Sequence, residues 1–139
     1  MPRILAIDYG TKRVGLAVTD SLKLIANTLT TVHAKDAIQY LKDYLAKEEV
    51  ECFVVGKPMR LDGTDSQSAV HVEKFVHLLG KNFPTIPVTM VDERFTSAIA
   101  KRSMLEMGLK KKDRANKSTV DQISAVLILQ TFMQMMSRE

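Results

Sequence analysis

Residues 3–19 read Arg3-Ile4-Leu5-Ala6-Ile7-Asp8-Tyr9-Gly10-Thr11-Lys12-Arg13-Val14-Gly15-Leu16-Ala17-Val18-Thr19, and this stretch decides the fold. Its two apolar runs, residues 3–8 and 14–19, each have the length and composition of a buried strand. The short link between them, residues 9–13, predicts an antiparallel hairpin. The hairpin places an acid, Asp8, at the end of its first strand.

Further elements follow along the chain. We expect a third strand over residues 24–32, an amphipathic helix over 36–48, a strand from Cys52 to Val55, a helix capped within 64–66 and ending near Gly80, a strand over 88–92, a helix from Thr96 or Ser97 to Met107, and a final helix capped by Ser118. Strands joined by hairpins and then alternating with helices predict an α/β domain with a mixed sheet. We expect five strands, three antiparallel at the N-terminus plus two parallel, flanked by helices in a single domain over residues 1–139.

Three acids stand where strands end or a helix begins. Asp8 ends the first apolar run, Glu93 closes the run that starts at Val88, and Asp121 opens the final apolar helix. In open α/β sheets, sites lie beyond the carboxyl ends of strands. Three converging carboxylates repel one another unless a cation neutralises them, and Mg²⁺ or Mn²⁺ suits oxygen ligands. Because a pair of such ions is a standard device for cutting phosphodiesters, we expect a nuclease with two ions held by these acids.

Each acid also has an ordinary structural interpretation. Asp8 can be a turn aspartate, and Asp-x-Gly-Thr also opens the phosphate loop of actin-like ATPases. Asp92 and Glu93 should point to opposite faces of the sheet, so only one of them can join Asp8, and we favour Glu93. Asp121 fits a capping box with Ser118, a role that needs no metal. The final helix is apolar nearly all round, which predicts that it is buried.

Basic residues cluster in one segment of a chain whose formal net charge is +4. Residues 110–117 carry five basic residues and one acid, so this segment accounts for the whole net charge. Such a patch suggests a polyanion as partner, and the alternative is a solvated lysine-rich loop. The candidate nucleic-acid contacts are Lys12, Arg13, Lys57, Arg94, Lys110, Lys111, Lys112, Arg114 and Lys117.

Several other classes of protein are disfavoured. No apolar stretch reaches the ~20 residues of a membrane span, and the N-terminus shows no secretory signal. The single cysteine, Cys52, cannot form an internal disulfide, so we expect a cytoplasmic protein with no membrane partner. The histidines, His33, His71 and His77, lack zinc-ligand spacing, and we expect them on the surface.

Four motifs together resemble the YqgF (RuvX) family, which belongs to the RNase H-like superfamily. They are Ile7-Asp8-Tyr9-Gly10-Thr11-Lys12-Arg13-Val14-Gly15, Val54-Val55-Gly56-Lys57-Pro58, Val91-Asp92-Glu93-Arg94-Phe95 and Asp121-Gln122-Ile123-Ser124-Ala125. Their order and spacing match over essentially the whole chain, and the family's acidic positions carry over to Asp8, Glu93 and Asp121. Two positions depart from the pattern: Lys57 replaces a leucine, and Ser124 stands where the related RuvC-type resolvases carry a further acid.

The resemblance implies a nuclease that matures the small-subunit (pre-16S) ribosomal RNA precursor, with pre-ribosomal particles among its partners. The second alternative is a Holliday junction resolvase acting on branched DNA, because family members are described in both ways. Symmetric paired cuts of a junction need a dimer with two active sites, and the sequence leaves both a monomer and a homodimer open. A binding module that keeps the fold without the catalysis is the third alternative.

Overall fold

The computed structural model describes residues 2–58, 69–92 and 117–137. The elements are β1 (Arg3–Tyr9), β2 (Arg13–Thr19), β3 (Ala26–His33), a 3-10 turn η1 (Ala34–Asp36), α1 (Ala37–Leu45), β4 (Val50–Lys57), α2 (Ala69–Asn82), β5 (Val88–Asp92) and α5 (Lys117–Ser137). The strands form one sheet in the order β3-β2-β1-β4-β5. β1, β2 and β3 pair antiparallel, and β4 pairs parallel with both β1 and β5. The predicted mixed five-stranded sheet is therefore confirmed.

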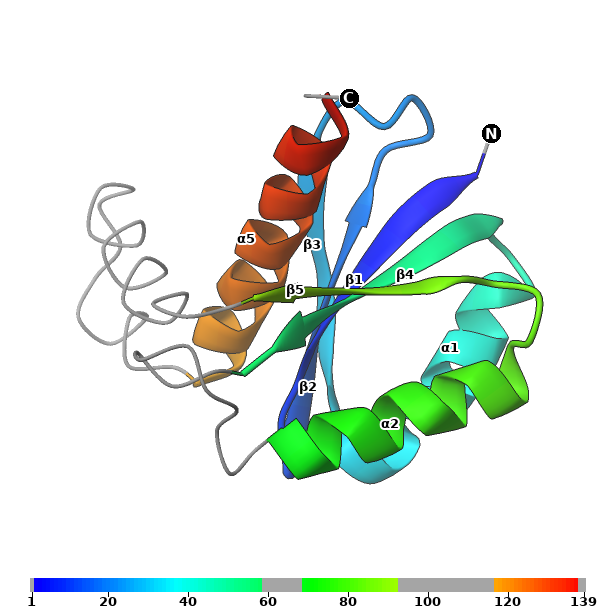
Figure 1. The fold of residues 1–139 in the computed structure, drawn as a ribbon, viewed down its shortest axis with the longest axis vertical. Coiled ribbons are helices and arrows are strands. Elements are labelled where there is room, and N and C mark those ends of the chain that lie inside the picture. The colour runs from blue at the N-terminus through cyan, green and yellow to red at the C-terminus, as the bar shows by residue number, and fades with distance from the viewer. Residues whose placement is uncertain (1, 59–68, 93–116, 138–139) are drawn as a thin grey trace.

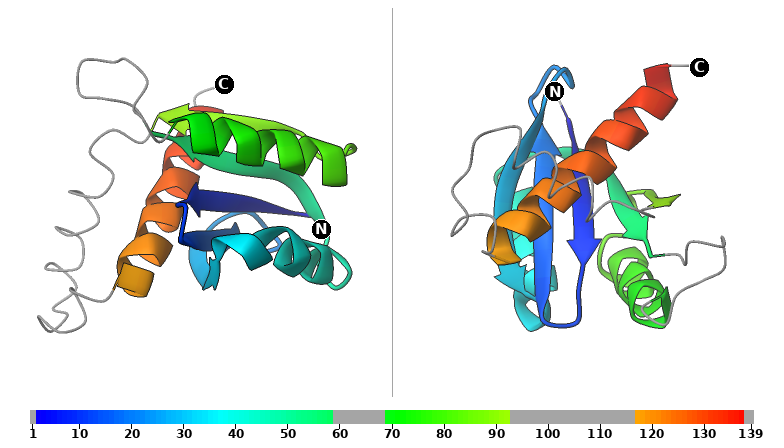
Figure 2. Two further views of the ribbon diagram at one scale, coloured as in Figure 1. Left: turned by 90° about the horizontal axis from the view of Figure 1, so that it is seen from below. Right: turned by 90° about the vertical axis from the view of Figure 1, so that its left-hand side faces the viewer.

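Helices cover both faces of this sheet. α1 and α2 pack on one face, and α5 crosses the other face over β1, β2 and β3 (Figures 1 and 2). Side chains alternate along β1, so that Leu5 and Ile7 join the core under α1 and α2, whereas Ile4 and Ala6 join the core under α5. This alternation fixes which face every later residue of β1 reaches.

The third strand begins two residues later than the sequence predicts. The Asp20 carboxylate accepts hydrogen bonds from the backbone amides of Leu24 and Ile25, each at 2.8 Å. Lys23, which lies between Asp20 and Leu24 in the sequence, has a φ of 59°, in the left-handed region. Because a side chain takes amides that a strand would use, Leu24 lies in the turn and is 70% exposed.

The helices also differ from the predicted ranges. The helix predicted over residues 36–48 is α1, which is shorter at both ends and follows the 3-10 turn. The predicted cap within residues 64–66 and the predicted helix from Thr96 or Ser97 to Met107 lie outside the described residues. The final helix begins at Lys117, one residue before its predicted cap, so Asp121 is its fifth residue and lies beyond the first turn.

The prediction that the final helix is buried nearly all round is wrong. Ser124, Ala125, Ile128 and Leu129 are buried, but the opposite side of α5 is open, and Met136 is 51% exposed. One layer of sheet on one side cannot cover a whole helix. None of the helices in the described ranges is long and apolar enough to cross a membrane.

Candidate active site

Asp8 lies on the face of the sheet that α5 covers. It follows Ile4 and Ala6 along β1, and strand alternation sends all three side chains to the same side. The next residue, Tyr9, points to the other side, where its ring stacks on Phe75 of α2 with centroids 4.5 Å apart. The end of β1 is thus anchored on one face by an aromatic pair while it presents a carboxylate on the other.

Gly15 brings the final helix down onto this carboxylate. Asp8 and Gly15 are directly opposite each other in the antiparallel pair of β1 and β2. A Cβ atom built on Gly15 would lie 2.5 Å from the carbonyl carbon of Asp121 and 3.0 Å from its Cβ. Only a residue without a side chain allows the backbone of α5 to come this close to β2. Asp121 is therefore held beside Asp8, although 112 residues separate them along the sequence.

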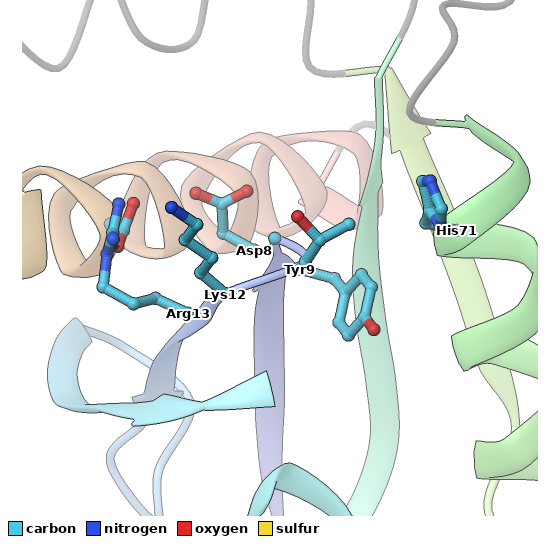
Figure 3. A pocket seen from close by; sticks show the side chains of 8 residues that line it. Asp8, Tyr9, Lys12, Arg13 and His71 are labelled. Atoms are coloured by element: carbon cyan, nitrogen blue, oxygen red, sulfur yellow. Dashed lines mark hydrogen bonds and ion pairs between the residues drawn. The ribbon is translucent and has the colours of Figure 1, made fainter. Parts of the chain in front are cut away.

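Both acids line one pocket of about 320 Å³. Figure 3 shows the Asp8 and Lys12 side chains pointing toward the same opening, with His71 facing it from α2. The lining residues come from the end of β1, the turn after it, the start of β2, α2 and α5: Asp8, Tyr9, Gly10, Thr11, Lys12, Arg13, His71 and Asp121. Two of the three predicted acids and two of the predicted basic residues therefore line the same pocket.

Arg13 contributes an ion pair inside this pocket. Its Nε donates to Asp121 Oδ2 at 2.9 Å, and the two side chains are 37% and 22% exposed. A charge-assisted hydrogen bond between partly buried groups holds both side chains in one arrangement. The sequence predicts Arg13 as a phosphate contact and does not predict this partner.

The turn that carries the basic residues is tightly closed. The Gly10 amide donates to the Arg13 carbonyl at 2.9 Å, and a Cβ on Gly10 would lie 2.7 Å from that oxygen. The carbonyl of Lys12 accepts from the Ala34 amide at 2.9 Å, which ties the turn to the segment after β3. Lys12 and Arg13 therefore start from a fixed backbone at the rim of the pocket.

His71 is the pocket residue that sequence reasoning missed. It is exposed, as expected, but it lines the pocket with the acids. It lies four residues before Phe75 on α2, so the two side chains share a helix face. Because Phe75 stacks on Tyr9 at the end of β1, His71 is brought to the pocket. The four-residue spacing between His71 and the aromatic Phe75 is the sequence signal that could have identified it.

The other predicted site residues that the structure describes lie outside the pocket lining. Lys57 ends β4 opposite Asp92 of β5, and neither lines the pocket. Since Val91 packs under α5, alternation puts Asp92 on the face away from Asp8, as predicted. Ser124 is buried and lies outside the pocket lining.

Six predicted site residues lie outside the described residues, and Lys117 is described only as the first residue of α5. The six are Glu93, Arg94, Lys110, Lys111, Lys112 and Arg114. Within the described ranges, no group of three acidic, histidine or cysteine side chains is arranged to hold a metal ion. The charged groups of the described pocket are the carboxylates of Asp8 and Asp121 and the basic side chains of Lys12 and Arg13, with His71 beside them.

Comparison with known proteins gives one consistent family. The model of the family described as "RuvX: Holliday junction resolvase" matches residues 2–135. A protein of Christiangramia forsetii named as a pre-16S rRNA nuclease is 55% identical over 133 residues, which cover 96% of this chain and 98% of that relative. A protein of Bacteroides thetaiotaomicron with the same name is 53% identical over 134 residues, covering 96% and 97%.

Solved structures agree on the fold. The chain is similar to Thermus thermophilus RuvC in complex with a Holliday junction substrate, with a TM-score of 0.57 and 16% identity over 99% of this chain and 98% of that one. A second structure of Thermus thermophilus RuvC gives a TM-score of 0.52 and 16% identity over 97% and 96%. At this level of identity the likeness supports the predicted RNase H-like fold.

Proposed function

Because the chain belongs to the RuvX family, we propose that it is a divalent-metal-dependent nuclease that cuts phosphodiester bonds of structured nucleic acid, with the pre-16S ribosomal RNA precursor as its substrate. The observation that carries the proposal is the meeting of Asp8 and Asp121 in one pocket beside Lys12 and Arg13. The names of the relatives favour the ribosomal substrate.

The chemistry of the pocket fits a hard cation. Its two carboxylates are half-buried on one face of the sheet, and carboxylate oxygens are the ligands that Mg²⁺ and Mn²⁺ prefer. Glu93 would complete the set as the residue after β5, since Asp92 lies on the opposite face. When bound, a pair of such ions supplies an activated water and stabilises the leaving oxygen.

The chain's own residues would hold and orient the substrate. Asp8, on the central strand of the sheet, and Asp121, pressed against Gly15, offer fixed carboxylates rather than mobile ones. Lys12 projects from the closed turn toward the opening and can bind a phosphate next to the acids (Figure 3). The basic segment over residues 110–117 would attract the polyanion from a distance, with binding that weakens as salt rises. Lys57 and Arg94 would extend this contact along the same end of the sheet.

The test is a cleavage assay with Mg²⁺ or Mn²⁺ on end-labelled precursor RNA. Wild type should cut, and Asp8→Asn should lose cutting while keeping its fold. Asp92→Asn is the matched control, because it removes the same charge at the same end of the sheet from the face away from Asp8. Metal-dependent cleavage that survives in Asp8→Asn would refute the proposed site.

A second candidate is the resolution of four-way DNA junctions, favoured by the description of the family model. Paired symmetric nicks require two sites and hence a homodimer, whereas RNA cutting needs only a monomer. A four-way junction run beside the RNA decides between them, with light scattering to give the mass. RNA binding without cutting of either substrate would favour the non-catalytic module. For any of these activities we propose a cytoplasmic setting, with pre-ribosomal particles as partners of the RNA nuclease.

A further inference from the structure

The ion pair between Arg13 and Asp121 links the start of β2 to α5 across 108 residues of sequence. Its bond from Nε to Oδ2 measures 2.9 Å and uses one of the five N–H donors of the guanidinium. The carboxylate that it occupies belongs to one of the two acids we propose as metal ligands. Arginine and metal would therefore compete for the same carboxylate.

The backbone makes this pairing hard to avoid. Arg13 and Gly15 lie two residues apart on β2 and share the face that α5 covers, since Ala17 on the same face packs under that helix. Gly15 lets Asp121 approach β2 closely, which brings its carboxylate within reach of Arg13. The same glycine is opposite Asp8. The guanidinium of Arg13 is thus paired with Asp121 in the pocket that Asp8 also lines.

We propose that Arg13 is the counter-ion of the metal-free site: it holds the Asp121 carboxylate until a divalent cation takes that group, and its guanidinium then becomes available to a phosphate of the nucleic acid. This inference rests on the proposed function, because it takes Asp121 as a metal ligand. Arg13 is accordingly a positioning residue toward the metal. It differs in this from Lys12, which lines the same pocket but forms no side-chain ion pair within the described residues.

The proposal predicts the sign of a change in metal affinity. Removing Arg13 removes a competitor for the Asp121 carboxylate and a charge that would repel a cation bound there. A contribution of the size usual for partly exposed ion pairs would tighten Mn²⁺ binding roughly twofold to fivefold in Arg13→Gln. A merely structural arginine would lower the melting temperature and leave metal affinity unchanged or weaker.

The experiment is calorimetric titration of the full chain with MnCl₂ in the absence of nucleic acid. We expect tighter binding in Arg13→Gln, wild-type affinity in Arg13→Lys, which keeps a competing charge, and a change below about twofold in the control Lys12→Gln, whose charge is exposed and screened. Equal gains in Lys12→Gln and Arg13→Gln would show a general charge effect and overturn the proposal. So would an Arg13→Gln affinity at or below that of wild type.

Two further measurements keep the test decisive. In an Asp121→Asn background, Arg13→Gln should no longer tighten binding, and a gain that persists there would overturn the pairing. If Arg13→Gln does not fold, the Nε–H resonance of Arg13 in the wild-type protein reports directly. Its exchange with water should be slow without Mg²⁺ and faster at saturating Mg²⁺, and an unchanged rate would overturn the proposal.

The failure of this inference is distinguishable from that of the proposed function, because no readout here is cleavage. If Arg13→Gln binds Mn²⁺ more tightly but the wild type cuts no nucleic acid, the counter-ion role is supported and the proposed nuclease activity is refuted. Metal-dependent cutting by wild type, with unchanged metal affinity in Arg13→Gln, would do the reverse.

Discussion

Replacing Gly15 by alanine should disturb both stability and catalysis, since one added methyl group meets the backbone of α5. The new Cβ would lie 2.5 Å from the carbonyl carbon of Asp121, where carbon atoms normally stay about 3.5 Å or more apart. Relief therefore requires α5 and β2 to separate locally by roughly 1 Å. Both contact partners are backbone or Cβ atoms, so no side-chain rotation can provide the room.

The size of both effects follows from this displacement. Overpacking of a close contact typically costs about 1–3 kcal/mol, and we expect Gly15→Ala to lower the free energy of unfolding by this amount. Moving the Asp121 carboxylate by roughly 1 Å relative to Asp8 should also reduce cleavage by about a hundredfold. The loss of rate should exceed what the unfolded fraction explains, since a protein destabilised by a few kcal/mol remains mostly folded.

Urea unfolding and the metal-dependent cleavage assay measure the two effects. Gly80→Ala is the matched control, because a Cβ at this position in α2 has nothing within 4 Å. Alanine is a better helix former than glycine, so Gly80→Ala should stabilise the protein by up to about 1 kcal/mol and leave cleavage unchanged. If Gly15→Ala has the same midpoint of urea unfolding as the wild type and cuts at the same rate, close packing at Gly15 does not position Asp121.

Three other predictions follow from the described side chains. Phe75 is buried and stacks on Tyr9, so Phe75→Ala should lower the free energy of unfolding by about 3–5 kcal/mol in urea, and a loss below about 1 kcal/mol would contradict the packing. The Ile25 amide donates to Asp20 and lowers the pKa of that carboxyl, so its stabilising effect should be complete above the ordinary pKa of about 4 and vanish as pH falls further. The difference in melting temperature between wild type and Asp20→Ala should then shrink below about pH 4, and a constant difference down to pH 2 would refute this. Burial raises the pKa of the Cys52 thiol, so its alkylation in the native protein should need a higher pH than in urea, and equal pH profiles would argue against burial as the cause.

The sheet could be predicted from the sequence because its signal is local. The runs over residues 3–8, 14–19 and 88–92 are apolar over the length of one strand, and each becomes a strand with a core-facing side. Leu24 shows the limit of this signal. Leu24 is as apolar as Ile25, which follows it, yet its backbone amide donates to the Asp20 side chain, and this local hydrogen bond outweighs the strand pattern.

Two of the three predicted acids, Asp8 and Asp121, line one pocket, but their contacts could not be predicted from the sequence. Asp8 and Asp121 stand out because each is a lone carboxylate at the end of an apolar element, where burial is expensive without a purpose. Two features depend on how the helices cross the sheet: α5 sets the ion pair of Arg13 with Asp121, and α2 sets the position of His71 at the pocket. No local pattern encodes those crossings, and they become visible only when the layers are assembled.

The long separation between the two halves of the site has a consequence for protein synthesis. The hairpin that carries Asp8 and Arg13 is made first, whereas 112 residues lie between Asp8 and Asp121. A growing chain can fold its early strands while it is still attached to the ribosome. It cannot assemble the pocket until α5 has been made as well.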